Sequence, residues 1–169
     1  MRGLFLLSAA VIALFCAVPA SAKDVGYYLE LGDTQTVGKY TLKDGVIKVD
    51  ARGTPLDGMQ VIVPPGSYPV EQVFTIKYTK VRKASVRDYV ISPLITIEGP
   101  VVPADGLIIV KIPCKLPENT VAMVFFYDDQ EKFTKALPPA SKEKGYVTGM
   151  TRILKDMVVV ATRTSSLKQ

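Results

Sequence analysis

The chain has 169 residues and a formal net charge of +5, and it contains neither histidine nor tryptophan. This modest charge favours anionic surfaces, but the sequence lacks the dense basic runs of a nucleic-acid-binding protein. Without histidine it cannot assemble a Ser-His-Asp or Cys-His catalytic arrangement, nor bind zinc or copper through imidazole. We therefore expect no enzyme, no cofactor, no metal and no nucleic-acid partner.

Residues 1–22 have the three-part pattern of an export signal. Arg2 supplies a short positive region, the stretch from Leu4 to Val18 is a nearly unbroken apolar run, and Ala20-Ser21-Ala22 is a small-residue cleavage site. The apolar run is shorter than the ~18 residues of a spanning helix, although an uncleaved anchor is the alternative. We expect an exported protein, periplasmic or secreted, with no transmembrane span after cleavage, a single domain over 23–162 and a polar tail over 163–169.

The sequence of the first half of the domain predicts short strands separated by turns. We expect a strand from Val25 to Leu31 that ends at Gly32-Asp33. A hairpin then follows, in which Val37–Lys43 and Val46–Asp50 flank Asp44-Gly45, a strong hairpin signal. Further strands are expected over 59–63, ending at the prolines of Pro64-Pro65-Gly66, and over 74–79, where apolar and polar residues alternate.

The stretch from Lys80 to Tyr89 is the one long polar segment inside the domain. It predicts a solvated loop or a charged edge strand. With the residue at position 77 it also forms a basic cluster, which is the candidate partner-binding surface or anionic-ligand site: Lys77, Lys80, Arg82, Lys83 and Arg87.

The second half continues the pattern. Strands are expected over 94–97, 107–112, 145–151 and 157–161, with a hairpin joining 121–127 to 132–137 and a helical turn over 152–155. No segment shows sustained apolar residues at helical spacing. About ten short strands separated by Gly, Pro and Asp turns indicate an all-β fold, an antiparallel β-sandwich or barrel, of which we expect the sandwich.

Several short motifs in this order resemble the ZU-five β-sandwich family of netrin receptors, zonula occludens proteins and ankyrins. They are Asp57-Gly58, Val63-Pro64-Pro65-Gly66, Ser92-Pro93 with Gly99-Pro100, Val110–Pro113 and Val124–Asp129. The resemblance spans roughly residues 37–161 and implies a structural or protein-interaction module. Some members cleave themselves at a His-Phe-Ser site. The corresponding Leu154–Val158 contains neither histidine nor serine, so self-cleavage is not supported.

Other candidate sites have simpler interpretations. Asp128, Asp129 and Glu131 cluster in a hairpin turn, where acidic residues are common, and a weak calcium site is the alternative. Cys16 belongs to the predicted signal, so Cys114 is a lone cysteine, expected to be a buried inert thiol rather than a reactive or intermolecular one. Two Ser-x-x-Lys matches, at Ser141 and Ser165, lack the partner motifs of penicillin-recognising enzymes.

The eight tyrosines are expected mainly in cross-strand packing, with exposed contact residues at positions such as Tyr68 and Tyr89 as the alternative. Together these features predict an exported, non-catalytic binding or structural module of the cell envelope. Such a module recognises a protein partner through loops or an edge strand. The alternatives are a module that binds an anionic or sugar polymer and a hydrolase run by acidic residues.

Overall fold

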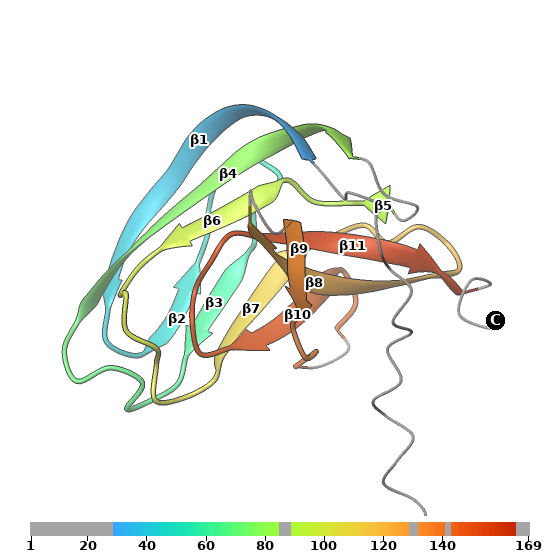
Figure 1. Cartoon of the computed structure of the whole chain (residues 1–169). Coiled ribbons are helices and arrows are strands. Elements are labelled where there is room, and N and C mark those ends of the chain that lie inside the picture. Colours follow the sequence, from blue (N-terminus) through green and yellow to red (C-terminus); the bar gives the residue numbers. More distant parts are fainter. Residues whose placement is uncertain (1–28, 85–88, 129–131, 141–142, 165–169) are drawn as a thin grey trace, which may run out of the picture.

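The computed structural model describes residues 29–84, 89–128, 132–140 and 143–164, so the predicted signal peptide lies outside the described residues. In this part of the chain eleven strands form two antiparallel sheets that pack face to face (Figure 1). The predicted all-β fold, an antiparallel sandwich, is confirmed.

The larger sheet has seven strands and contains the long pair β1 and β4, which arch together across the molecule (Figure 1). In sheet order its strands are β1 (Leu29–Leu42), β4 (Gln72–Ala84), β6 (Leu94–Glu98), β11 (Met157–Arg163), β8 (Thr120–Asp128) and β9 (Lys132–Ala136), with β5 (Tyr89–Val90) also beside β11. Strands β1 and β4, 14 and 13 residues long, are longer than the short strands that the sequence predicts.

The smaller sheet has four strands in the order β10-β7-β3-β2. Their bounds are β10 (Tyr146–Thr151), β7 (Ile108–Pro113), β3 (Gln60–Val63) and β2 (Gly45–Lys48). In β7, Ile108, Val110 and Ile112 are fully buried, and the residues between them are partly exposed. Because alternate side chains of a strand point to opposite faces, this pattern places one face of the sheet against the core.

The core fills the space between the sheets. Phe74 and Ile76 of β4 are fully buried in the same cluster as the β7 residues. Tyr68, in the connection before β4, is 2% exposed and packs its ring 6.1 Å from that of Phe74. It is therefore a core residue, which agrees with the packing interpretation of this tyrosine.

The hairpin predicted at Asp44-Gly45 is wrong. β1 pairs with β4 and β2 pairs with β3, so the turn carries the chain from one sheet to the other. Gly45 has a φ of 114°, as a turn glycine would, but turn chemistry does not choose the strands' partners. Gly32-Asp33 also fails to end a strand, because β1 passes through it with a register shift between Leu31 and Thr34.

Other local predictions have mixed outcomes. The β8–β9 hairpin is confirmed, whereas residues 152–155 form a bend and irregular chain rather than a helical turn. Lys80–Ala84 belong to β4, so the strand alternative for the polar segment is the one that the structure takes. Strand β11 includes Arg163, and the N–H of Thr164 donates to the carbonyl oxygen of Asn119, so both residues of the predicted tail are held.

Candidate functional site

The larger sheet splits next to the basic segment. β6 pairs with β4 from Thr75 to Thr79. Beyond Thr79 the register gives Val81, Lys83 and Ala84 partners on β1, with register shifts, and among the described residues it gives Lys80–Ala84 no partner on the other side. The chain that precedes β6 turns away instead, because β5 pairs with β11. The split therefore lies between the end of β4 and the segment from Tyr89 to Pro93.

Ser92 and Pro93 explain where the sheet divides. Proline has no N–H to donate to a neighbouring strand, so it ends regular pairing at this point. The buried Ser92 hydroxyl accepts the N–H of Val159 at 2.8 Å and donates to the carbonyl oxygen of Pro93 at 2.8 Å. The N–H of Ile91 donates to the carbonyl oxygen of Val159 at 3.0 Å. These bonds fasten the segment to β11 and leave the side of β4 open.

A cavity of about 720 Å³ occupies this split and opens to the surface. Its lining contains three cations, Lys80, Arg82 and Lys83, and one carboxylate, Asp33. The other lining residues are Gln35, Pro55, Tyr78, Val81, Ala84, Val90, Ile91, Ser92 and Pro93. We call this cavity the basic groove. Its side chains offer positive charge and hydrogen-bond donors at an open surface.

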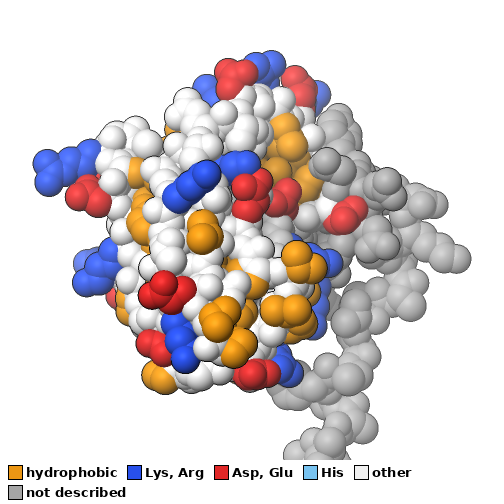
Figure 2. Space-filling view, turned by 90° about the vertical axis from the view of Figure 1, so that its left-hand side faces the viewer, with side chains coloured by type: hydrophobic (Ala, Val, Ile, Leu, Met, Phe, Trp, Pro, Cys, Tyr) orange, Lys and Arg blue, Asp and Glu red, His pale blue; other side chains and the backbone are white. Residues whose placement is uncertain are grey.

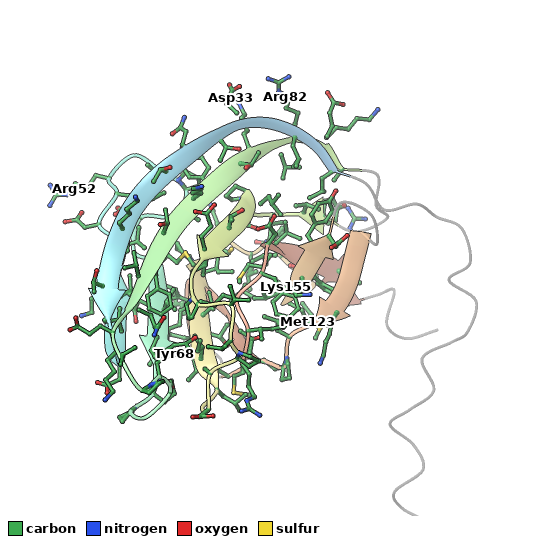
Figure 3. All side chains as sticks on the ribbon, turned by 60° about the vertical axis from the view of Figure 1, so that its left-hand side comes forward. Asp33, Arg52, Tyr68, Arg82, Met123 and Lys155 are labelled. Atoms are coloured by element: carbon green, nitrogen blue, oxygen red, sulfur yellow. The ribbon has the colours of Figure 1, made fainter. Side chains whose placement is uncertain are left out.

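The wall formed by β1 and β4 is held by cross-strand hydrogen bonds. The hydroxyl of Tyr78 donates to Gln35 Oε1 at 2.6 Å, and the hydroxyls of Thr34 and Thr79 lie 2.8 Å apart. Figure 3 shows Asp33 and Arg82 at the crest of the arched pair. The Arg82 side chain lies against Gly32, where an added Cβ would meet Arg82 Nε at 2.9 Å. Glycine thus lets the guanidinium lie close to the β1 backbone.

The cations of the groove have few internal partners. No ion pair joins Lys80, Arg82 or Lys83 to a carboxylate within the described part of the chain, although Glu30 faces Lys83 across the β1–β4 pair. All three side chains are exposed. Their charge is therefore available to an external anion.

The five predicted partner-binding residues do not form one surface. Three of them, Lys80, Arg82 and Lys83, line the basic groove. Lys77 does not, because it is half-buried on β4 and forms an ion pair with Glu98 of β6. Arg87 lies outside the described residues.

Sequence reasoning missed the groove's polar and proline-containing walls. Asp33 reads as a turn residue, and Tyr78 and Gln35 are 43 residues apart in the chain. Ser92-Pro93 is a local signal for interrupted pairing, but nothing in the sequence indicates which strand receives the diverted segment. That choice depends on contacts with β11.

The remaining candidate sites have different outcomes. Cys114 is buried, and burial raises the pKa of its thiol to about 12, as expected for an inert side chain. Asp128 is exposed at the end of β8, while Asp129 and Glu131 lie outside the described residues, so the calcium alternative stays a prediction. Among the residues that can be described, no group of three or more candidate metal ligands occurs.

Some apolar side chains are exposed on two adjoining connections. Val70 lies between β3 and β4, while Val101, Val102 and Leu107 lie between β6 and β7. The N–H of Asp105 donates to the carbonyl oxygen of Ser67, which joins the two connections. Hydrophobic side chains also gather on the lower half of the face in Figure 2, among charges of both signs. The two connections therefore expose several apolar side chains, whereas the basic groove is lined by three cations.

Comparison with known proteins gives no relative: no protein-family model matches the chain, and no curated protein matches it. The resemblance to the ZU-five family therefore stays a prediction. Within the described ranges, no helix has the length and apolar character needed to span a membrane.

Proposed function

We propose that this protein is a non-catalytic binding module that recognises an acidic segment of a partner protein through the basic groove. The observation that carries the proposal is the presence of three exposed cations, with one carboxylate, in the lining of a cavity of about 720 Å³. An anionic side chain entering it would meet several donors at once, and such electrostatic complementarity sets both specificity and association rate.

Two further features support a binding role. The three cations of the groove belong to strand β4, which pairs with β1, so a strand rather than a loop carries them. The resemblance to the ZU-five family also implies an interaction module, exported according to the predicted signal. We place the partner in the cell envelope or the extracellular space.

The test is affinity capture from an envelope extract of the source cell, with the purified protein as bait. We would compare the wild-type protein with a groove variant carrying Lys80→Glu, Arg82→Glu and Lys83→Glu. The matched control carries Lys43→Glu, Lys48→Glu and Lys115→Glu, which makes the same change in net charge at exposed lysines outside the groove. Lys77 stays unchanged because it already pairs with Glu98.

We expect the wild type and the control to retain one protein at a stoichiometric level, and the groove variant to lose it without a lower melting temperature. The captured protein should be released as salt shortens the Debye length from about 10 Å at 0.1 M to about 3 Å at 1 M. Equal capture by the groove variant would contradict the proposal. Recovery of a protease-resistant polymer instead of a protein would favour the anionic-polymer alternative.

A further inference from the structure

A second cavity, of about 790 Å³, lies where the edge strands of the two sheets meet, and it shares no lining residue with the basic groove. Phe126 of β8, Lys135 of β9 and Met150 of β10 contribute to it. A hydrogen bond joins the two sheets on this side, because the N–H of Met150 in β10 donates to Pro138 O, shortly after β9. The N–H of Leu137 donates to Val124 O and extends the β8–β9 pairing. Strands of both sheets therefore contribute to the cavity, together with the connections next to them.

The floor of this cavity is apolar. Phe126 and Leu137 are buried, Met150 is half-buried, and Leu107 adds an exposed apolar wall. Thr151 supplies the one hydroxyl of the lining, and it already donates to the carbonyl oxygen of Ile153 at 2.6 Å and accepts its N–H at 3.1 Å. A sugar ring would find few hydrogen-bonding groups on this floor, whereas a hydrocarbon chain would bury apolar surface there.

The rim of the cavity is positively charged. Lys135, Arg152 and Lys155 are exposed, and none of the described residues that line the cavity is a carboxylate. Arg152 is anchored, because its Nε donates to the carbonyl oxygen of Ala104 at 2.8 Å, and its terminal nitrogen lies 4.0 Å from the exposed Asp105. In the described part of the chain no ion pair involves either lysine. The cations therefore stand beside apolar surface with most of their charge unmatched.

We propose that this cavity binds a single-chain anionic amphiphile of the fatty-acid class. The acyl chain lies on Phe126, Leu137 and Met150, and the carboxylate lies among Lys135, Arg152 and Lys155. The cavity volume falls within the range of about 300–1,000 Å³ that small-molecule sites have. A ligand with both parts satisfies the apolar floor and the cationic rim together, which neither a short acid nor an uncharged hydrocarbon does.

The test is displacement of a bound fluorescent fatty acid, cis-parinaric acid, from the purified protein. Laurate should displace the probe at a concentration about tenfold lower than dodecanol, because a charge-assisted hydrogen bond is worth about 1.4 kcal/mol or more. Butyrate, which has the charge without the chain, should not displace it. Equal potency of laurate and dodecanol would overturn the assignment of the cationic rim.

Variants locate the binding to this cavity. Lys135→Gln with Lys155→Gln should weaken laurate binding about three- to tenfold and leave dodecanol unchanged, while the control pair Lys48→Gln and Lys115→Gln should alter neither. Leu107→Glu, at a half-exposed wall, should weaken both ligands. Retained laurate affinity in the cavity variants, or binding to phosphatidylglycerol vesicles without binding of monomeric laurate, would overturn the proposal.

This site is independent of the proposed function. The groove variant with Lys80, Arg82 and Lys83 changed to glutamate should bind laurate as the wild type does. A loss of partner capture with retained laurate binding would support both proposals. A loss of laurate binding in the groove variant would contradict the assignment of the amphiphile to this second cavity.

Discussion

The Cys114 thiol shows how a single residue follows its surroundings. It is 8% exposed, and its backbone N–H donates to the carbonyl oxygen of Gly145 at 3.0 Å. Burial favours the neutral thiol over the thiolate and so raises its pKa to about 12. We predict that a thiol reagent at pH 8 leaves Cys114 unmodified in the folded protein and modifies it in denaturant. The Cys114→Ala variant identifies any signal from Cys16, and rapid modification of folded protein would contradict the prediction.

The same thiol makes stability depend on pH. Its folded-state pKa of about 12 exceeds the ordinary value of 9.0, so the folded state holds a proton that the unfolded state loses first. Its contribution is present below about pH 9 and is lost as pH rises toward 12, with a slope of at most about 1.4 kcal/mol per pH unit. Denaturant titrations of the wild type and Cys114→Ala at pH 8 and pH 10 measure this slope by difference. Parallel changes in the two proteins would refute it.

Residue identity alone does not show which cations of the basic segment form an internal ion pair and which line the basic groove. Lys77 and Lys80 are three positions apart on the same strand, yet one pairs with Glu98 and the other lines the basic groove. The sequence predicts a charged cluster because it shows only spacing along the chain. Strand pairing brings Glu98 beside Lys77, and the diverted segment leaves Lys80 beside an open space.

The split in the larger sheet is decided by one connecting element, the segment that holds Ser92 and Pro93. We predict that Ser92→Ala lowers the free energy of unfolding by about 1–3 kcal/mol, because the buried N–H of Val159 loses its acceptor. Thr120→Ala is the matched control: its hydroxyl donates to Pro117 O at an exposed position, and its loss should cost within about 0.5 kcal/mol. Chemical denaturation measures both changes, and equal costs would contradict this role for Ser92.

Gly149 sets how closely the two sheets approach at the scale of the whole molecule. A Cβ at this position would meet Leu137 Cβ at 3.1 Å and Val124 Cβ at 3.2 Å, both in or next to the opposing sheet. We predict that Gly149→Ala destabilises the protein by about 1–3 kcal/mol through overpacking. Gly32→Ala is the control, because its closest contact is the flexible Arg82 side chain. A melting temperature of Gly149→Ala equal to that of the control would contradict the prediction.

The sequence by itself determined the fold class, most of the strands and the β8–β9 hairpin. Alternation of apolar and polar residues over 74–79 predicts a strand, although Thr75 and Thr79 on its polar face are buried as well. A short turn between adjacent segments such as 121–127 and 132–137 favours local pairing. The absence of histidine likewise depends on no structure. These properties depend on local sequence patterns or on composition, so the sequence is enough to predict them.

Only the tertiary structure decided which strands pair and where the cations gather. The Asp44-Gly45 turn has the chemistry of a hairpin, yet β1 gains a longer partner in β4, whose paired residues are thirty or more positions away along the chain, and β2 pairs with β3. Side chains separated in sequence meet in both cavities, where Asp33 faces the end of β4 and Lys135 shares a rim with Lys155. Long-range strand pairing depends on contacts throughout the core between the two sheets. A local sequence pattern does not contain the combined effect of those contacts.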